Sequence, residues 1–169
     1  HSDVIHGCLM MNNPDLREQL YFIQKSCGAV PGPQDCFLIL RGLKTLDLRM
    51  ERHCENGEAV AKYLRAHEKV GRVDWCGVED NPGYAIAKKQ MRDFGGMISF
   101  TFKNDTMETA LEFRKKIQLF ALTESLGVVE SLVVHPASMT HDSIPRSRTL
   151  KPGLPHSLHL LTVGIENSN

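Results

Sequence analysis

The first third of the chain carries apolar residues at helical spacing. One set consists of Leu16, Leu20, Ile23 and Cys27. Asn13 can cap the start of this helix, and Gly28 can end it. The pattern is helical again from Asp35 to His67, with a bend or interruption expected near Gly42. It predicts a buried side made of Leu43, Leu46, Met50, His53, Ala61 and Leu64.

Beyond His67 the pattern changes to short strands that alternate with helices. In residues 96–103, one set of side chains alternates with another, as in a half-buried strand: Ile98, Phe100 and Phe102 against Met97, Ser99 and Thr101. The other predicted strands are 70–75, 119–122, 129–134 and 158–165, and the predicted helices are 82–92 and 106–118. This succession predicts an α/β sandwich in which helices cover a small antiparallel or mixed sheet.

Charge and hydropathy exclude several classes of function. The 169 residues include 20 basic and 20 acidic side chains, and the sequence pI is about 7.2. The chain therefore lacks the concentrated positive charge that attracts nucleic acids and anionic membranes. Apolar residues make up 41% of the chain, and no stretch approaches the roughly 18 uninterrupted apolar residues of a membrane span. We expect a globular protein that binds neither nucleic acid nor membrane.

The cysteines and histidines indicate neither disulfides nor a metal site. The 5 cysteines are an odd number without a Cys-x-x-Cys pair, so free thiols in a reducing cytoplasm are expected. None of the 8 histidines is paired at the i, i+4 spacing of a helical zinc site. We therefore predict no metal.

The most informative run is Glu-Ser-Leu-Gly-Val-Val-Glu-Ser-Leu at 124–132, followed by His-Pro-Ala-Ser-Met-Thr-His at 135–141. A hydroxyl-rich turn, broken by Gly127, lies between apolar segments where the backbone can approach a ligand closely. Three further motifs accompany it, at His1–Val4, Arg41–Leu46 and Arg49–His53. In this order, the four motifs resemble the transsulfuration enzymes, a family of pyridoxal phosphate (PLP) enzymes that includes cystathionine γ-lyase, cystathionine γ-synthase and methionine γ-lyase.

The resemblance implies the C-terminal part of a fold-type I, aminotransferase-like enzyme, in which a long helix leads into a small α/β sandwich domain. Residues 1–34 would finish the large PLP-binding domain, 35–67 would be a connecting helical region, and 68–169 a small C-terminal α/β domain that stops before its last helix. It also implies small amino-acid substrates and a homotetramer. In the family, the lysine that holds PLP lies in a Lys-Tyr-x-x-Gly run just before the His-Ser-Asp stretch. We therefore expect this lysine upstream of His1, and expect the chain to be inactive alone.

The resemblance also implies roles for individual residues. Three match positions at the substrate pocket: Ser125, Glu124 and Thr140. Ser2 and Asp3 match the stretch that supports the site after the cofactor lysine. His141 matches a position near the pocket, although a lone histidine is more often a packed, hydrogen-bonded side chain than an acid or base. The residues alone favour a serine that satisfies the backbone of a turn, and only the surrounding motif favours the substrate pocket.

Three positions depart from the family pattern. Family members carry an arginine in Ser-Leu-Ile-Arg-Leu-Ser-Val-Gly-Ile-Glu that grips the substrate α-carboxylate, and this chain has Leu160 there. Only His159 or a shifted Arg148 could compensate, and the side chain of His159 should point to the other face of the strand. Val128 replaces the second glycine of Leu-Gly-Gly, and Asp142 replaces a small residue after Met-Thr-His. A non-catalytic C-terminal module that pairs with full-length subunits is therefore an alternative to the enzyme.

Overall fold

The computed structural model describes residues 1–139 and 154–167. They form two compact units, His1–Leu46 and Asp47–Asn169. The division falls inside the helical region 35–67. None of the helices in the described ranges combines the length and apolar content of a membrane-spanning segment.

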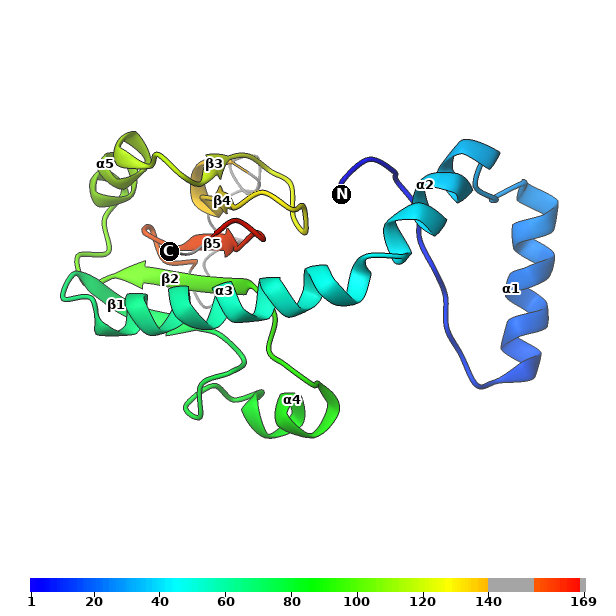
Figure 1. Cartoon of the computed structure of the whole chain (residues 1–169), viewed down its shortest axis with the longest axis horizontal. Coiled ribbons are helices and arrows are strands. Elements are labelled where there is room, and N and C mark those ends of the chain that lie inside the picture. Colours follow the sequence, from blue (N-terminus) through cyan, green and yellow to red (C-terminus); the bar gives the residue numbers. More distant parts are fainter. Residues whose placement is uncertain (140–153, 168–169) are drawn as a thin grey trace. The chain divides into compact units, whose positions relative to one another are not determined.

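The first unit contains two helices, α1 (Pro14–Cys27) and α2 (Pro33–Leu43) (Figure 1). The Asn13 side chain accepts hydrogen bonds from the backbone N–H groups of Asp15 and Leu16, at 3.0 and 3.2 Å. Gly28 ends α1 in the left-handed conformation, with a φ of 68°. Both predicted ends of this helix are confirmed. No residue of α1 or α2 is buried.

The remaining elements are α3 (Leu46–Ala66), β1 (Val70–Asp74), α4 (Tyr84–Gln90), β2 (Met97–Phe102), α5 (Met107–Lys116), β3 (Ala121–Leu122), β4 (Leu132–Val134), the 3-10 turn η1 (Pro136–Ser138) and β5 (His159–Thr162). Among the described residues, the strands form one sheet in the order β1-β2-β5-β4-β3. β3 and β4 pair in parallel, and the other neighbours pair antiparallel. The predicted α/β architecture is confirmed, and of the two sheet types expected, antiparallel or mixed, the structure has the mixed one.

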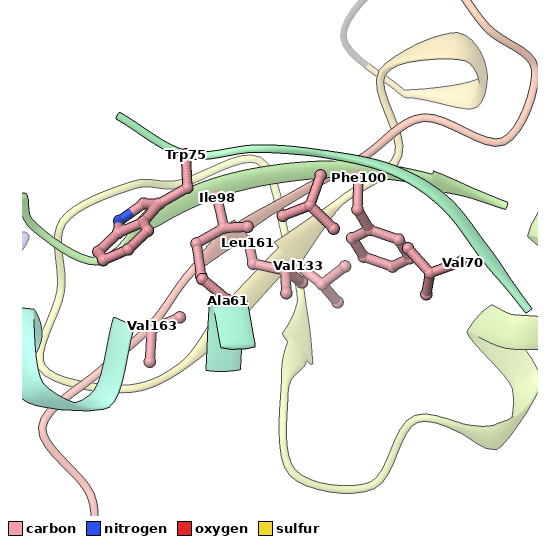
Figure 2. Close-up of a cluster of buried hydrophobic side chains, with 9 residues drawn as sticks. Ala61, Val70, Trp75, Ile98, Phe100, Val133, Leu161 and Val163 are labelled. Atoms are coloured by element: carbon pink, nitrogen blue, oxygen red, sulfur yellow. The ribbon is translucent and has the colours of Figure 1, made fainter. Parts of the chain in front are cut away.

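The hydrophobic core lies on one face of this sheet, against α3 (Figure 2). Strand alternation places Ile98, Phe100 and Leu161 on this face, and Ala61 of α3 is completely buried with them. A Cβ atom added at Gly57 of α3 would lie 2.5 Å from the carbonyl oxygen of Gly95. Glycine at this position therefore lets the helix approach the backbone that leads into β2.

The helical period predicted the buried side of residues 35–67 only in part. The prediction is correct for His53 and Ala61, which are buried, and for Leu64, which packs against the core. It is wrong for Leu43, Leu46 and Met50, which are exposed. The interruption expected near Gly42 occurs at residues 44–45, between α2 and α3. Burial along α3 begins at His53, because only the later turns have sheet residues to pack against.

Candidate functional site

Residues 123–131, which contain the Glu-Ser-Leu-Gly run, connect β3 to β4. Backbone N–H groups of Ala121 and Thr123 donate to carbonyl oxygens on the β4 side, at 2.9 and 3.2 Å, so the two ends of the loop are held together. Gly127 has a φ of 71°, a left-handed conformation that few residues other than glycine adopt. The loop is therefore a constrained turn.

The residues predicted in this loop differ in exposure. Glu124 is exposed and Ser125 is half-buried. Val128, where the family has its second glycine, is only 8% exposed. The next residue, Val129, accepts a hydrogen bond from the Ile165 N–H at 2.9 Å. The added side chain of Val128 thus lies inside the protein, while Glu124 remains accessible to solvent.

Leu160 lies in β5, where Ser99 of β2 and Val134 of β4 are its register partners. Its side chain is half-buried. His159 lies on the opposite face, where its ring stacks on Phe100 with 5.4 Å between ring centroids. The Leu160 position therefore offers a ligand apolar surface and no hydrogen-bond donor.

Two polar residues of α3 hold the chain that follows β5. His53 Nδ1 donates to the carbonyl of Val163 at 2.6 Å. The Asn56 side-chain amide donates to the carbonyls of Gly164 and Glu166, at 2.9 and 2.8 Å. The helical period predicted that His53 lies on the buried side, but it did not predict Asn56. The signal that could have found it is the i, i+3 spacing of two polar residues on a buried helix face.

Ser131 and Glu166 then tie this segment to the candidate loop. The Ser131 backbone N–H and hydroxyl donate to the two carboxylate oxygens of Glu166, at 2.5 and 2.9 Å. The Ser131 hydroxyl also accepts from the Gly164 N–H at 2.9 Å. The end of the loop and the end of β5 are thus fixed to one another and, through Asn56, to α3.

His135 and His159 are completely buried, with 4.9 Å between their ring centroids. Burial lowers the pKa of His159 to about 4 and also lowers that of His135. Each ring donates one hydrogen bond to a main-chain carbonyl: His159 Nδ1 to Ser157 and His135 Nε2 to His156, both at 2.8 Å. At neutral pH these side chains are uncharged groups that hold the fold.

Ser2 and Asp3 belong to the first unit, and both are exposed. Ser2 has a φ of 54°, which is uncommon for a residue other than glycine. The Asp3 carboxylate lies 3.7 Å from the Arg41 guanidinium, an exposed ion pair that contributes little stability. Four other residues considered from the sequence lie outside the described residues: Thr140, His141, Asp142 and Arg148.

The described residues enclose neither a lysine nor a metal site. Every lysine in residues 1–139 and 154–167 is exposed, namely Lys25, Lys44, Lys62, Lys69, Lys88, Lys89, Lys103, Lys115 and Lys116. In the same ranges, no three His, Cys, Asp or Glu side chains are arranged to hold a metal ion.

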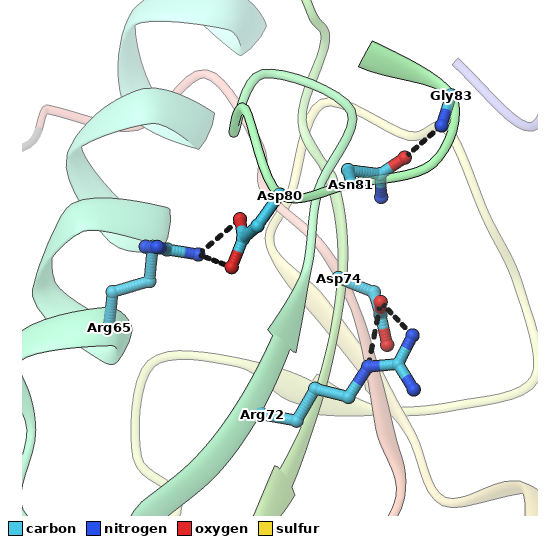
Figure 3. A network of polar contacts seen from close by, with 6 residues as sticks. All are labelled: Arg65, Arg72, Asp74, Asp80, Asn81 and Gly83. Atoms are coloured by element: carbon cyan, nitrogen blue, oxygen red, sulfur yellow. Dashed lines mark hydrogen bonds and ion pairs between the residues drawn. The ribbon is translucent and has the colours of Figure 1, made fainter.

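A polar network beside edge strand β1 is separate from these residues (Figure 3). Arg65 donates to both carboxylate oxygens of Asp80, at 2.9 and 3.2 Å, and Arg72 donates twice to one oxygen of Asp74, at 3.0 and 2.7 Å. With Asn81, they line a depression of about 430 Å³. The four charged side chains are 36% to 69% exposed and already paired, so the network is typical of surface ion pairs.

Three comparisons with known proteins agree. Residues 1–169 match the family described as Cys/Met metabolism PLP-dependent enzyme. The chain is 51% identical to a cystathionine β-lyase of Coxiella burnetii and 47% identical to a cystathionine γ-synthase of Mycobacterium tuberculosis; the matches cover 98% and 99% of this chain but 43% and 42% of those proteins. A crystal structure of cystathionine γ-lyase from Lactobacillus plantarum with L-serine matches with a TM-score of 0.88 at 41% identity, over 99% of this chain and 44% of that one. The chain thus spans less than half the length of these relatives, and it belongs to the Cys/Met metabolism family of PLP-dependent enzymes.

Proposed function

We propose that the chain is the C-terminal portion of a PLP-dependent enzyme of sulfur amino-acid metabolism. The proposed reaction is elimination or replacement at the γ-carbon of cystathionine or of a homoserine-derived amino acid. The observation that carries this proposal is the match of nearly the whole chain, at 47% and 41% identity, to a cystathionine γ-synthase and a cystathionine γ-lyase. PLP, when bound, supplies the electron sink for such chemistry. Because the relatives include lyases and a synthase, the match does not select between cleavage and replacement.

In this proposal, the loop of residues 123–131 contacts the substrate. Ser125 orients the amino acid, and Glu124 and Thr140 also bind it. The constrained geometry of the loop supports this role, because a fixed loop loses little conformational entropy when a ligand binds. Leu160 offers the α-carboxylate of a substrate no hydrogen-bond donor. Either another residue binds this carboxylate, or the pocket binds a different substrate, or the pocket no longer binds a substrate.

The proposed enzyme is a cytoplasmic homotetramer. Residues 1–34 complete its PLP-binding domain, and residues 68–169 form the small C-terminal domain. The helical region 35–67 connects these two domains. Strongly exposed apolar side chains in the first unit support burial against other parts of an assembly: Ile5, Met10, Tyr21, Phe22 and Phe37. The 5 free cysteines are compatible with a reducing compartment.

The 169-residue polypeptide alone should be inactive, because none of its described lysines is enclosed. The test is to express residues 1–169, add PLP and L-cystathionine, and measure the absorbance of bound PLP and the release of products. A second polypeptide, extended upstream of His1 to include a whole PLP-binding domain with its Lys-Tyr-x-x-Gly run, should show both binding and turnover. Turnover by residues 1–169, with a lysine adduct that borohydride traps, would disprove the assignment of the cofactor lysine to another segment.

A second candidate function is a non-catalytic module that pairs with full-length subunits. Leu160 in place of the carboxylate-binding arginine favours the module, whereas the retained Ser125 loop favours the enzyme. Native mass spectrometry of the chain mixed with a full-length transsulfuration enzyme separates the two. A module forms mixed oligomers and changes the activity of its partner, while an isolated enzyme portion does neither.

A further inference from the structure

Resting on the proposed function, we propose that Arg114 is a positioning residue that fixes the turn at residues 135–139, which leads into the predicted substrate residue Thr140. Arg114 lies in α5, and its Nη1 donates to the Ser138 hydroxyl oxygen at 2.8 Å. Ser138 is the last residue of η1 and lies two residues before Thr140. The resemblance and the motifs gave no role to Arg114, because it lies outside all of them.

The hydrogen bonds around Ser138 run in one direction. His135 Nε2 lies 2.8 Å from the carbonyl oxygen of His156, which can only accept, so Nε2 carries the ring proton. The buried ring is neutral, so its Nδ1 is an acceptor. This Nδ1 lies 2.7 Å from the Ser138 hydroxyl, which therefore donates to it. Since the hydroxyl proton is used there, its oxygen accepts from Arg114, and the chain runs from Arg114 through Ser138 to His135.

The main chain holds this turn only weakly. The N–H groups of Ser138 and Met139 donate to the carbonyls of His135 and Pro136 at 3.3 Å each, near the long limit for such bonds. His135 and Pro136 are buried and Ser138 is half-buried, so the side-chain contacts act where water competes little. The link from α5 through Ser138 therefore fixes the turn at residues 135–139.

Arg114 is placed poorly for a residue that only stabilises the fold. Its side chain is half-buried, and Nε is buried without a hydrogen-bond partner among the described residues. No carboxylate within the described ranges forms a salt bridge with it. Desolvating a guanidinium in this way is unfavourable. Arg114→Met, which keeps the apolar stem and removes every donor, should therefore loosen the turn without lowering the thermal midpoint much.

Hydrogen exchange on the 169-residue chain tests the contact directly. Arg114→Met should raise the exchange rate of the Ser138 and Met139 amides by about tenfold and leave β2 and β5 unchanged. Arg114→Lys, which retains a donor, should restore part of the protection. Lys115→Met is the matched control, because Lys115 is exposed on the same helix, and it should change nothing. Unchanged exchange at 138–139, or an equal rise across the sheet, would overturn the positioning role.

Kinetics of the catalytically active protein that contains this chain test the consequence. Arg114→Met should raise KM for the amino-acid substrate about fivefold or more while kcat stays within about twofold, and Arg114→Lys should lie between it and the wild type. A loosened turn with unchanged KM would overturn the link to substrate binding. If the wild-type protein has no transsulfuration activity, the proposed function fails and the role in substrate binding falls with it, while exchange at 138–139 still decides whether Arg114 fixes the turn.

Discussion

The two units of the chain have equally clear local helix signals but bury very different amounts of apolar surface. Asn13 caps α1 in the first unit as Thr106 caps α5 in the second. Yet Tyr21, Phe22 and Phe37 of the first unit are 56% to 69% exposed, whereas Ile98 and Phe100 of the second are at most 1% exposed. Caps and periodicity therefore specify that a helix forms. Burial depends on whether another element is available to cover the helix.

The largest effect should come from truncating matched aromatic residues in the two units. Phe100→Ala removes a completely buried ring from the core and should lower the free energy of unfolding by about 3–5 kcal/mol. Phe22→Ala removes a ring that is 69% exposed and should change it by no more than about 0.5 kcal/mol. Urea denaturation measures both. Similar losses at the two positions would show that the first unit buries Phe22 in solution and would break the comparison.

Lowering the pH should reduce the free energy of unfolding by about 3 kcal/mol through His159 in the second unit. Its pKa is about 4 in the folded protein against an ordinary value of 6.5, because the ring is buried. The unfolded chain therefore binds the proton more tightly, so this stability is present above about pH 6.5 and lost as the pH falls toward about 4. His135, whose pKa is also lowered, acts in the same direction.

His159→Ile isolates this contribution. Isoleucine stands at this position in the family pattern, and it removes both the unpartnered Nε2 and the hydrogen bond from Nδ1 to the Ser157 carbonyl. The variant should therefore lose only about 1 kcal/mol of unfolding free energy at neutral pH. Its unfolding free energy should depend less on pH between about 6.5 and 4. His6→Ile, at an exposed position of the first unit, is the control and should leave the wild-type slope unchanged. A wild-type slope in His159→Ile would contradict the assignment.

The sequence predicted most elements of the fold because their signals are local. Alternation identified β2, and Thr106 marked the start of α5. The strand predicted at 129–134 was too long, because β4 begins at Leu132. Before it, Val129 pairs with Ile165, and Ser131 binds the Glu166 side chain. An apolar run cannot distinguish such contacts from strand pairing.

The candidate site was predictable only where a motif marked it. The Glu-Ser-Leu-Gly run indicated a turn for a ligand, and the structure places a constrained turn there. Helical spacing could have placed Asn56 on the buried side of α3, but it could not reveal its partners, which lie 108 or more positions away in the chain. Arg114 could not be identified, because its partner lies 24 positions away. Such contacts depend on how α3 and α5 pack on the sheet, which no local pattern encodes.

A smaller loss, about 1–2 kcal/mol in the free energy of unfolding, is expected from Leu160→Arg. The new cation would lie in a half-buried position between Ser99 and Val134, where desolvation is unfavourable unless a substrate carboxylate pairs with it. We expect a lower thermal midpoint without tighter substrate binding, because Val128 and Asp142 also depart from the family pattern. Substrate affinity and midpoint are measured in a full-length protein. Tenfold tighter binding at an unchanged midpoint would show that the pocket still functions.

The smallest effect should follow removal of the first unit. The second unit has its own sheet and core, so residues 47–169 should unfold cooperatively with a free energy within about 1 kcal/mol of that of the whole chain. Residues 1–46 alone should be largely unfolded, because short helices without a buried face are marginal in water. Circular dichroism during urea titration of both fragments measures this. A cooperative transition in residues 1–46, or a loss of several kcal/mol in residues 47–169, would show that the first unit contributes a core of its own, and the contrast between the units would then be one of degree.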